Sequence, residues 1–388
     1  MEKNLKRKIT SRCRILGFSH GNINVPYTWS GINHHFFAAL KKKCRVVRIL
    51  NGARYEVIPE NKKKKKELTI FSNFKKFIPE YNRLWKKEIK KIDEPYDFIL
   101  HLHIRPFIKD KVPSAFYIDM VQQDKTMASL YHFTFPEAPS ARIPDKVIRR
   151  LERHIYHAAA RVFTFSQYVK RQIIKYYNIA PQKIIPVGAG PNFSHLPKIE
   201  NKLYDGKTIL FVGTNFQRKG GVTLLEAFKK VREIIPEAKL IIVSTVLKSY
   251  IRGNKLQSFN IFIKKFSNKQ FLGFLYRRAS VFVLPSLYEA FGIAFLEAMA
   301  YKLPCIGTNI CAMPEIIEDG RTGFLVSPNQ PSELAERLIF LLKHPDIARK
   351  MGERGYQKLI KYYTWDRVVD RMLPEIEKVL RQQELHKS

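Results

Sequence analysis

The chain has 388 residues, a length that predicts two domains or one unusually large domain. Hydrophobic residues make up 45% of it and aromatic residues 12%, which is enough apolar surface for a globular core and excludes wholesale disorder or a fibre. Because 69 Lys and Arg face 34 Asp and Glu, the net charge is +35, and a steady partner of this surface should be anionic: nucleic acid, anionic lipid or a phosphorylated small molecule.

Cysteine usage and the N-terminal residues favour a cytoplasmic protein. The four cysteines contain no CxxC pair, which fits neither a disulfide framework nor a zinc module. Polar residues follow the basic N-terminus where a signal peptide needs an apolar stretch, so secretion is not expected. The longest apolar window, Val281–Ala300, is long enough to cross a bilayer. Because it contains Pro285, Glu289, Gly292 and Glu297, we predict that it is buried protein core instead.

The first half of the chain alternates short apolar runs with helical patterns, which is typical of βαβ units and a parallel sheet. The predicted strands are Cys13–Phe18, Arg45–Leu50, Phe98–Leu102, Ala115–Ile118, Arg161–Phe165 and Ile184–Val187. An amphipathic helix is predicted over Gly31–Leu40. The basic runs Lys41–Lys43 and Lys62–Lys66 lie beside apolar and aromatic residues, which suits either an anionic surface or a solvated loop.

A polar stretch, Pro197–Lys207, leads into a second α/β series. Its predicted strands are Thr208–Gly213, Lys239–Val243, Val281–Leu284, Pro304–Gly307 and Gly323–Val326. Its predicted helices are Gly221–Ile235, Gly292–Ala300, Pro331–Lys343, Pro345–Tyr362 and Thr364–Gln383. The predicted fold class is therefore α/β, with two Rossmann-like domains, residues 1–200 and 201–364, facing each other across a ligand-binding cleft.

One loop of the second half combines glycine with positive charge. It runs from Gly213 to Gly221, between a predicted strand and helix, and contains Arg218 and Lys219. It is not a Walker A loop, because Gly220 and Gly221 follow the cations where that motif places Lys and then Ser or Thr. Glycine lets the backbone approach a phosphate, and a helix N-terminus offers N–H groups. The loop is predicted to bind a diphosphate, with an ordinary surface turn as the alternative.

Two carboxylates stand out in the apolar run that follows the strand Val281–Leu284. Ionised carboxylates are costly to bury without partners, so Glu289 and Glu297 need an explanation. Glu289 is placed in the loop at the carboxyl edge of the sheet, and Glu297 about one and a half turns into the next helix. Sugar or ribose hydroxyls would satisfy both, and the N–H groups of Phe291, Gly292 and Ile293 could hold a phosphate. Salt bridges to nearby cations are the alternative.

The two glutamates carry a resemblance to a known family. With seven residues between them and Ala-Met-Ala after the second, they resemble the glutamate motif of the retaining glycosyltransferases of family 4, which have the GT-B fold. Further segments with that family's pattern are Lys302–Gly307, Met313–Ile317, Asp319–Val326 and Thr364–Asp366. In the first half Gly17–Asn24, Thr28–Gly31, Ser166 and Pro186–Gly190 resemble it more loosely. The GT-B fold implies a last helix, residues 365–388, that returns to the first domain.

The resemblance implies a role for each matching residue of the second half. Arg218 and Lys219 would bind the donor diphosphate, and Glu297 would bind the ribose hydroxyls. Glu289 would contact the donor sugar rather than act as a nucleophile. The base would lie near Gly213 and the loop around residues 243–245.

In the first half the matching positions are fewer. Ser30 and Gly31 would let the backbone reach the donor phosphates. Asp119 stands where many relatives carry a histidine, and it is either a contact to the acceptor or the sugar hydroxyls, or an ordinary strand-end carboxylate. His101 and His103 point the same way from one strand and could ligate a metal, but no carboxylate cluster accompanies them. Since GT-B enzymes lack the Asp-x-Asp metal site of the other main glycosyltransferase fold, no metal and no cofactor are expected.

Together with the site residues, the resemblance implies a retaining hexosyltransferase that moves a sugar from a nucleotide-sugar donor to a saccharide or lipid-linked acceptor in cell-surface polysaccharide synthesis. The expected location is the cytoplasm, with peripheral binding to the anionic inner face of the membrane as a further hypothesis. A polyanion-binding protein is the rival class, although no nucleic-acid motif is present, so nucleic acid is not expected as a partner. A phosphorylase or a sugar epimerase with the GT-B fold is the second alternative.

Overall fold

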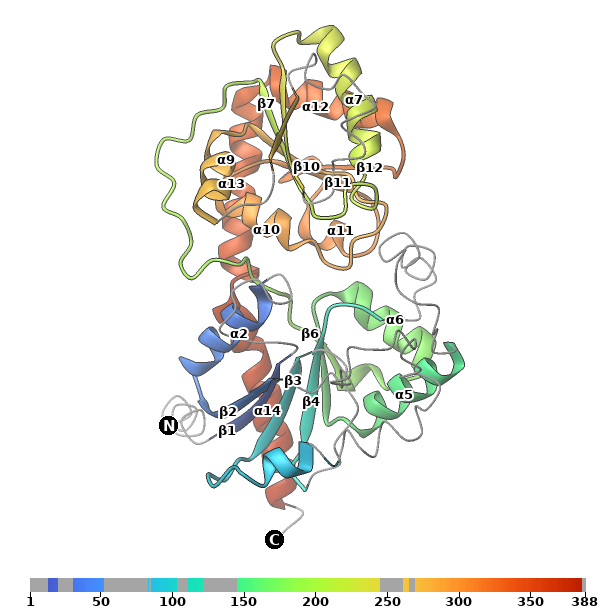
Figure 1. Ribbon diagram of the computed structural model, residues 1–388, viewed down its shortest axis with the longest axis vertical. Helices are drawn as coiled ribbons and strands as arrows, with labels where there is room; N and C mark the ends of the chain where they lie inside the picture. The colour runs from blue at the N-terminus through green and yellow to red at the C-terminus, as the bar shows by residue number, and fades with distance from the viewer. Residues whose placement is uncertain are drawn as a thin grey trace, which may run out of the picture. The chain divides into compact units, whose positions relative to one another are not determined.

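The computed structural model describes residues 13–19, 31–51, 83, 85–102, 111–121, 145–244, 261–264 and 269–385 (Figure 1). The chain divides into two compact units. Unit 1 comprises Met1–Ala128, Phe135–Asn192 and Trp365–Ser388, and unit 2 comprises Ser129–Thr134 and Phe193–Thr364. The basic run Lys62–Lys66 lies outside the described residues.

Unit 1 is built on a parallel sheet with the strand order β2-β1-β3-β4-β5-β6. Its strands are β1 (Arg14–Ser19), β2 (Arg45–Asn51), β3 (Phe98–Leu102), β4 (Ser114–Ile118), β5 (Arg161–Thr164) and β6 (Ile184–Pro186). Its helices are α2 (Ile32–Lys41), α5 (Asp145–Ala158), α6 (Gln167–Tyr177) and α14 (Trp365–Leu385), with a short 3-10 helix at Pro181–Lys183. The six predicted strands are confirmed, with ends that differ by at most one residue.

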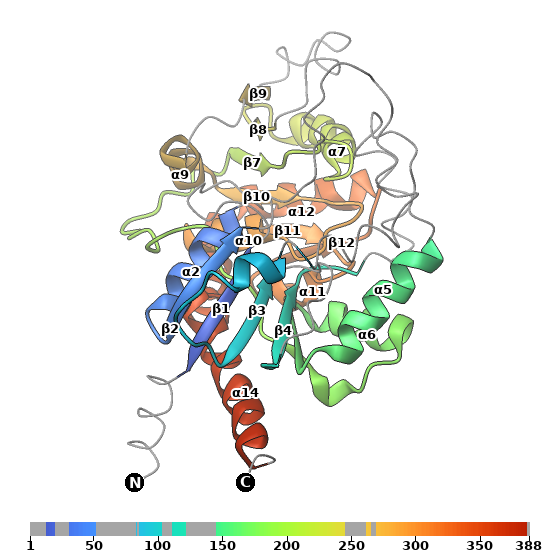
Figure 2. The same cartoon turned by 60° about the horizontal axis from the view of Figure 1, so that its bottom comes forward.

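Side chains that alternate along the strands bury both faces of this sheet, which is how a parallel sheet is normally covered. On one face Phe116 and Ile118 pack in a cluster with residues of α5 and α6. On the other face Tyr117 meets Phe36 of α2, with ring centroids 5.2 Å apart. Gly17 of β1 also faces α2, because a Cβ there would lie 2.6 Å from the Phe37 ring. Unit 1 is therefore a three-layer α/β structure (Figure 2).

The last helix, α14, belongs to unit 1 and is fastened to it by polar contacts (Figures 1 and 2). At its start the Trp365 indole N–H donates to the Pro191 carbonyl over 2.8 Å. Further along, Arg371 donates to the Val187 carbonyl and Arg161 pairs with Glu375 at 3.2 Å. These contacts place the C-terminal residues beside β5 and the end of β6, so the chain returns to its first unit after completing the second.

Unit 2 repeats the plan with a second parallel sheet, in the order β12-β11-β10-β7-β8-β9. Its strands are β7 (Thr208–Val212), β8 (Lys239–Val243), β9 (Ile261–Lys264), β10 (Val281–Leu284), β11 (Cys305–Thr308) and β12 (Gly323–Val326). Its helices are α7 (Gly221–Ile234), α9 (Lys269–Arg278), α10 (Ile293–Ala300), α11 (Met313–Ile316), α12 (Pro331–Lys343) and α13 (Pro345–Tyr362).

The apolar window Val281–Ala300 is the centre of unit 2, as predicted. Strand β10 is fully buried, and its Phe282 ring meets Tyr276 of α9 and Phe295 of α10. Strand β9 and helix α9 have no counterpart among the predicted elements. Their sequences are short and rich in Lys and Arg, so neither the strand period nor the helix period is evident there. Within the described residues, no helix combines the length and the apolarity that a membrane crossing requires.

Candidate functional site

Two loops meet at the carboxyl edge of the sheet of unit 2. The first, residues 213–220, connects β7 to α7, and the second, residues 285–292, connects β10 to α10. Strands β7 and β10 are hydrogen-bonded neighbours, with Val281 opposite Ile209. Since parallel strands end at the same edge, the pairing brings the two loops side by side, at the edge where open α/β sheets bind ligands. Every predicted site residue of the second half except Glu297 and Ile293 lies in these loops.

The two loops are fastened to each other through their backbones. The Leu287 N–H donates to the Arg218 carbonyl over 2.9 Å, and the Arg218 guanidinium returns a bond of 2.8 Å to the Tyr288 carbonyl. Gly220 has φ of 73°, and a Cβ at this position would lie 1.8 Å from the Pro285 carbonyl oxygen. Only glycine permits both this conformation and this approach. The loops therefore form one unit whose shape depends on Gly220.

Lys219 and Glu289, one from each loop, form an ion pair at this edge. Their side chains are 13% and 10% exposed. The Glu289 carboxylate also accepts a bond of 3.4 Å from the Ser286 hydroxyl. Burial, together with the nearby Arg218 guanidinium, lowers the pKa of Lys219. A buried ammonium group needs a nearby anion to stay charged. In this structure Glu289 is that anion, and a bound phosphate would be another.

Arg218 is the second cation of the site, and it is half-buried. Burial lowers the pKa of its guanidinium, which nevertheless stays charged because an arginine titrates far above neutral pH. One of its nitrogens bonds the Tyr288 carbonyl, so the side chain is oriented by the second loop. The two neighbouring cations have different partners: a carbonyl for Arg218 and a carboxylate for Lys219.

The structure adds detail to the predicted phosphate loop. The N–H groups expected at the N-terminus of α7 stay a prediction, whereas several amides of the loop before it are bonded within the loop. The Gly220 N–H donates to Gln217 O over 2.9 Å, and the Gly221 N–H donates to Phe216 O over 2.8 Å. The Arg218 amide donates to the Asn215 side chain at 3.0 Å. A compact turn precedes the helix, so anion binding here depends on side chains rather than on these amides.

The N-terminus of α10 is the other predicted phosphate position. Helix α10 begins at Ile293 after Gly292, whose φ of 89° is in the left-handed region. A Cβ at Gly292 would lie 3.3 Å from Glu289 Cγ, so this turn lies directly against the glutamate. Phe291 is buried, with its ring centroid 6.1 Å from that of Tyr363. The helix start and Glu289 are thus neighbours, as the sequence predicted.

Glu297 has a different set of contacts from Glu289. It lies in α10 and accepts a hydrogen bond of 3.3 Å from the hydroxyl of Tyr276 in α9. Tyr276 is fully buried and stacks on Tyr301, with ring centroids 5.3 Å apart. Burial, and then the Glu297 carboxylate, raise the pKa of the Tyr276 hydroxyl. A neutral tyrosine donor is therefore available to orient the Glu297 carboxylate.

At the predicted base-binding position, β7 and β8 end together. The Gly213 N–H donates to Val243 O over 2.9 Å, and the Ser244 hydroxyl donates to Thr214 O over 3.4 Å. Gly213 also lies against the lysine of the pair, because a Cβ at this position would be 3.0 Å from Lys219 Cγ. Residue 245 lies outside the described residues.

The predicted residues of the first half lie in unit 1. Gly31 caps helix α2 with φ of 86° and is buried, while Ser30 lies outside the described residues. Asp119 directly follows β4 and is half-buried. Burial is the main cause that raises the pKa of the Tyr156 hydroxyl, and the charges of Glu152 and then Asp119 raise it further. The acidic side chain therefore lies near the core under α5, at the carboxyl edge of the sheet of unit 1.

The histidine pair gives no support for a metal site. His101 is stacked between Phe18 and Phe116, with centroid distances of 4.6 and 4.5 Å, and burial lowers its pKa to about 3. His103 lies outside the described residues. Among the residues that the structure describes, no group of three or more His, Cys, Asp or Glu could hold a metal ion.

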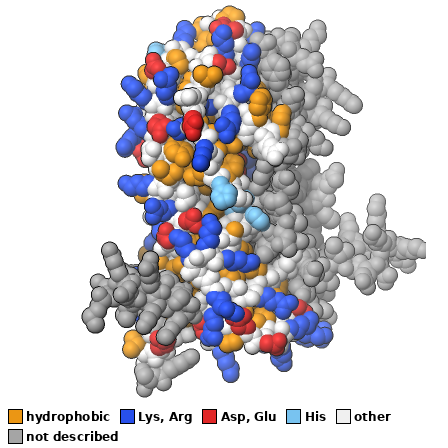
Figure 3. All heavy atoms as spheres, turned by 90° about the vertical axis from the view of Figure 1, so that its left-hand side faces the viewer, with side chains coloured by type: hydrophobic (Ala, Val, Ile, Leu, Met, Phe, Trp, Pro, Cys, Tyr) orange, Lys and Arg blue, Asp and Glu red, His pale blue; other side chains and the backbone are white. Residues whose placement is uncertain are grey.

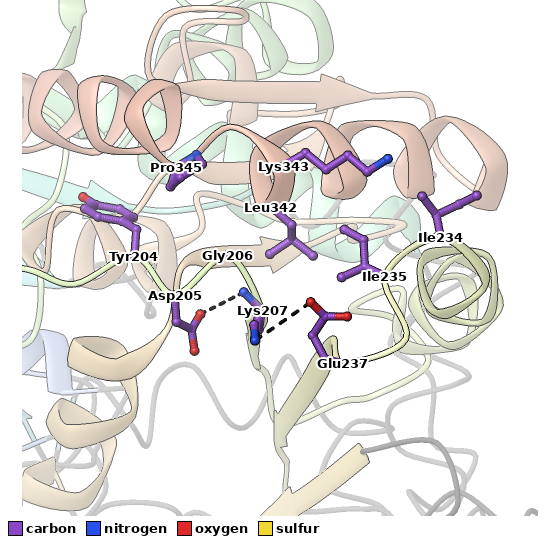
Figure 4. A pocket seen from close by; sticks show the side chains of 10 residues that line it. All are labelled: Tyr204, Asp205, Gly206, Lys207, Ile234, Ile235, Glu237, Leu342, Lys343 and Pro345. Atoms are coloured by element: carbon purple, nitrogen blue, oxygen red, sulfur yellow. Dashed lines mark hydrogen bonds and ion pairs between the residues drawn. The ribbon is translucent and has the colours of Figure 1, made fainter.

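A hollow of about 360 Å³ on unit 2 lies away from the predicted site (Figure 4). Lys207 and Glu237, which line it, precede β7 and β8, so the hollow is at the amino edge of the sheet. These two residues form an ion pair at 3.9 Å, and Asp205 accepts a bond from the Lys207 amide. None of the predicted site residues lines the hollow.

Three residues of the site were not predicted from the sequence. Ser286 is buried and bonds Glu289, and Thr308 bonds the Ser286 carbonyl over 2.6 Å. Ser286 follows a strand at its carboxyl end, and this position is a signal that could have identified it. Tyr276, the partner of Glu297, lies in a helix that the sequence pattern did not reveal, so no signal pointed to it.

The chain is similar in fold to known sugar-transferring enzymes. Sucrose-phosphate synthase from Thermosynechococcus elongatus superposes with a TM-score of 0.68 at 17% identity, over 97% of this chain and 100% of that one. HepE from Anabaena, solved in complex with UDP and glucose, superposes with a TM-score of 0.59 at 12% identity, over 94% and 99% of the two chains. At these identities the likeness concerns the fold alone, and that fold is GT-B.

Family models match both units. The model for glycosyl transferases group 1 matches residues 193–358, and the model for glycosyltransferase family 4 matches residues 14–190. The chain belongs to glycosyltransferase family 4. A curated relative, the N-acetyl-alpha-D-glucosaminyl L-malate synthase of Bacillus anthracis, is 30% identical over 179 residues, which are 44% of this chain and 46% of that one. The chain thus spans about half the length of the curated relatives it matches.

Proposed function

We propose that this protein transfers a hexose from a nucleotide-sugar donor to a saccharide or lipid-linked acceptor, with retention of the anomeric configuration. The observation that carries the proposal is the meeting of Arg218, Lys219 and Glu289 at the carboxyl edge of the sheet of unit 2. Two cations and a carboxylate in adjacent loops are complementary to a diphosphate joined to a polyhydroxylated sugar. Membership of glycosyltransferase family 4 and the UDP and glucose bound by the structural neighbour HepE support this donor class.

The cations act where negative charge develops. As the bond between the sugar and the diphosphate breaks, charge accumulates on the leaving oxygen, and fixed positive groups stabilise it without reorganisation. Arg218 and Lys219 fill this role, because both are restrained by contacts to the second loop. In the proposal they do the work that a metal ion does in other transferases, so no metal is required.

The two carboxylates, Glu289 and Glu297, are assigned to the hydroxyl groups of the donor. Glu289 accepts hydrogen bonds from the sugar hydroxyls and Glu297 from the ribose hydroxyls, with Tyr276 orienting Glu297. The N–H groups at the start of α10 face the same ligand from Gly292 and Ile293. In unit 1, Ser30 and Gly31 are proposed to approach the donor phosphates and Asp119 the acceptor hydroxyls.

A first test is ligand-induced stabilisation. The full chain is heated with UDP, GDP or ADP, and with the corresponding glucose conjugates. A ligand at a hundred times its dissociation constant adds about 2.7 kcal/mol to the stability, which is visible as a higher midpoint. We expect one nucleoside diphosphate to stabilise the wild type and to lose this effect in Lys219→Met. If no nucleotide stabilises the wild type, the donor class is wrong.

Two further tests address the reaction. With the active donor and a panel of saccharide acceptors, nuclear magnetic resonance reports the anomeric configuration of the product, and an inverted product would refute retention.

A lipid-linked acceptor would require the protein to bind a membrane surface, and the net charge of +35 favours an anionic one. On the face drawn in Figure 3, Lys and Arg side chains lie scattered among hydrophobic and acidic groups. Sedimentation with anionic vesicles at low salt should carry the protein down, and its absence from the pellet would refute peripheral membrane binding.

A further inference from the structure

The ion pair between Lys219 and Glu289 poses a problem for a site that must bind a diphosphate. Both side chains are nearly buried, and they belong to different loops. Within the described residues the Lys219 ammonium has no other side-chain partner, and Glu289 has only the long bond from Ser286 besides it. The free protein therefore neutralises the cation that the donor needs with the carboxylate that the sugar needs.

A diphosphate and a carboxylate compete for the same ammonium. If Glu289 keeps its position while a diphosphate approaches Lys219, the two anions repel each other in a poorly hydrated site. If the carboxylate turns away, the ammonium is available to the phosphate oxygens and the carboxylate needs other donors. Sugar hydroxyls, which are attached to the same ligand, are such donors.

We propose that Glu289 occupies Lys219 in the free protein and that the donor diphosphate displaces it, so that the carboxylate becomes available to the sugar only when the diphosphate is in place. This inference rests on the proposed function. It gives the pair a role in selection: a sugar without a diphosphate meets a carboxylate that is already engaged, and the diphosphate itself prepares the sugar subsite.

The surroundings of Glu289 allow this exchange. Gly292 lies against Glu289 Cγ and carries no side chain that could bond the carboxylate. The one other hydrogen bond to the carboxylate within the described residues is 3.4 Å long, and so it is a weak restraint. The backbone that leads to Glu289 is fixed, since the Ser286 carbonyl is bonded by Thr308 and the Leu287 amide donates to the Arg218 carbonyl. A side chain on a fixed backbone can change partner without moving the loop.

The inference makes a counter-intuitive prediction for Glu289→Gln. Removing a residue of the binding site should tighten the binding of the nucleoside diphosphate, by about three- to tenfold, because the competitor for Lys219 is gone. The corresponding nucleotide-sugar should gain less or nothing, because the carboxylate that accepts the sugar hydroxyls is lost as well. The affinities for UDP, GDP, ADP and their glucose conjugates are measured by isothermal titration calorimetry on the full chain.

Two further variants separate the ion pair from general charge. Glu353→Gln makes the same charge change at a surface pair of unit 2, where Glu353 contacts Lys302 at 2.9 Å, and it should leave every affinity unchanged. The second comparison is Lys219→Met with Lys219→Met/Glu289→Gln. Without the lysine the carboxylate and the diphosphate share no ammonium, and Arg218 bonds a carbonyl rather than Glu289, so the added Glu289→Gln change should produce no gain. The double variant leaves no carboxylate unpaired at this position, so it should fold even if Lys219→Met alone folds poorly. In that case the double variant is compared with Glu289→Gln, which should bind the diphosphate more tightly.

The outcomes are distinct. The inference holds if Glu289→Gln tightens diphosphate binding only when Lys219 is present. It is overturned if Glu289→Gln binds the diphosphate as the wild type does or more weakly, or if the gain persists without Lys219, while the wild type binds the diphosphate normally. If the wild type binds none of the diphosphates, the proposed function fails and the inference fails with it.

Discussion

The substitution Gly220→Ala tests whether the two site loops depend on each other. Gly220 has φ of 73°, and an added Cβ would lie 1.8 Å from the carbonyl oxygen of Pro285. The left-handed conformation costs a non-glycine residue about 1 kcal/mol, and displacing a packed backbone typically costs a further 1–3 kcal/mol, roughly. We therefore expect a loss of about 2–4 kcal/mol in the free energy of unfolding of unit 2, together with a loss of diphosphate binding, because Lys219 moves with the loop.

A matched control is available in the same unit. Gly320 has φ of 68°, but nothing lies within 4 Å of the position of its Cβ. Gly320→Ala thus carries the conformational cost without the collision, and it should lose about 1 kcal/mol and keep diphosphate binding. The difference between the two variants isolates the contact between the loops.

The assay must distinguish the two units. All three tryptophans, Trp29, Trp85 and Trp365, belong to unit 1, so tryptophan fluorescence during urea unfolding follows unit 1. Hydrogen exchange measured by mass spectrometry on peptides of residues 208–234 follows unit 2. Gly220→Ala should accelerate exchange in these peptides and leave the fluorescence midpoint unchanged. If Gly220→Ala and Gly320→Ala lose the same stability, the reasoning about the loop contact is wrong.

Three further predictions concern single groups, each checked on the full chain. Hydrogen bonds from Arg14 at 2.7 and 3.0 Å lower the pKa of Asp97, so this carboxylate stabilises unit 1 above the ordinary carboxyl range and ceases to do so as the pH falls through its lowered pKa. Asp97→Asn should lower the free energy of unfolding of unit 1 at pH 7 by about 1 kcal/mol, as followed by fluorescence in urea, and show a smaller acid-dependent loss than the wild type; equal acid profiles would contradict this. Burial lowers the pKa of Lys202 to about 7, whereas an unfolded lysine titrates near 10.4, so the unfolded state binds more protons between these values and unit 2 should gain stability as the pH rises from 7 to 10. Hydrogen exchange should lose this rise in Lys202→Met, and a rise that persists would refute the assignment. Tyr276→Phe removes the donor to Glu297 and should weaken nucleoside diphosphate binding by about three- to tenfold in calorimetry with little change in stability; unchanged affinity would separate Glu297 from the ribose.

The sequence predicted the sheets well, because a buried parallel strand is a short, continuous apolar run between turn residues. Phe98–Leu102, Lys239–Val243, Val281–Leu284 and Gly323–Val326 have the bounds that the sequence predicted. Strand β9 was missed, since the run Ile261–Lys264 is as short as β10 but lies in a basic context, with Lys264 and Lys265 at its end. Its place at the sheet edge is a tertiary property, which depends on pairing with β8 rather than on a local pattern.

The candidate site was predicted in its residue types but not in its internal contacts. Spacing placed Glu289 in the loop after β10 and Arg218 and Lys219 in the loop after β7, and the pairing of these strands brings them together. Sequence alone could not show that β7 and β10 are neighbours, because they are far apart along the chain. The structure shows the ion pair that was the alternative interpretation of Glu289, with Lys219 as its partner, and the role of Glu289 as a sugar contact stays a prediction.

The most direct test of the account is hydrogen exchange of the wild-type chain with saturating UDP, GDP or ADP. The account predicts that one of these diphosphates slows exchange in the two site loops, residues 213–221 and 285–297, and that Lys219→Met abolishes this protection. If no diphosphate protects either loop, or if the protection is the same without Lys219, the carboxyl edge of unit 2 is not the donor site and the account is contradicted.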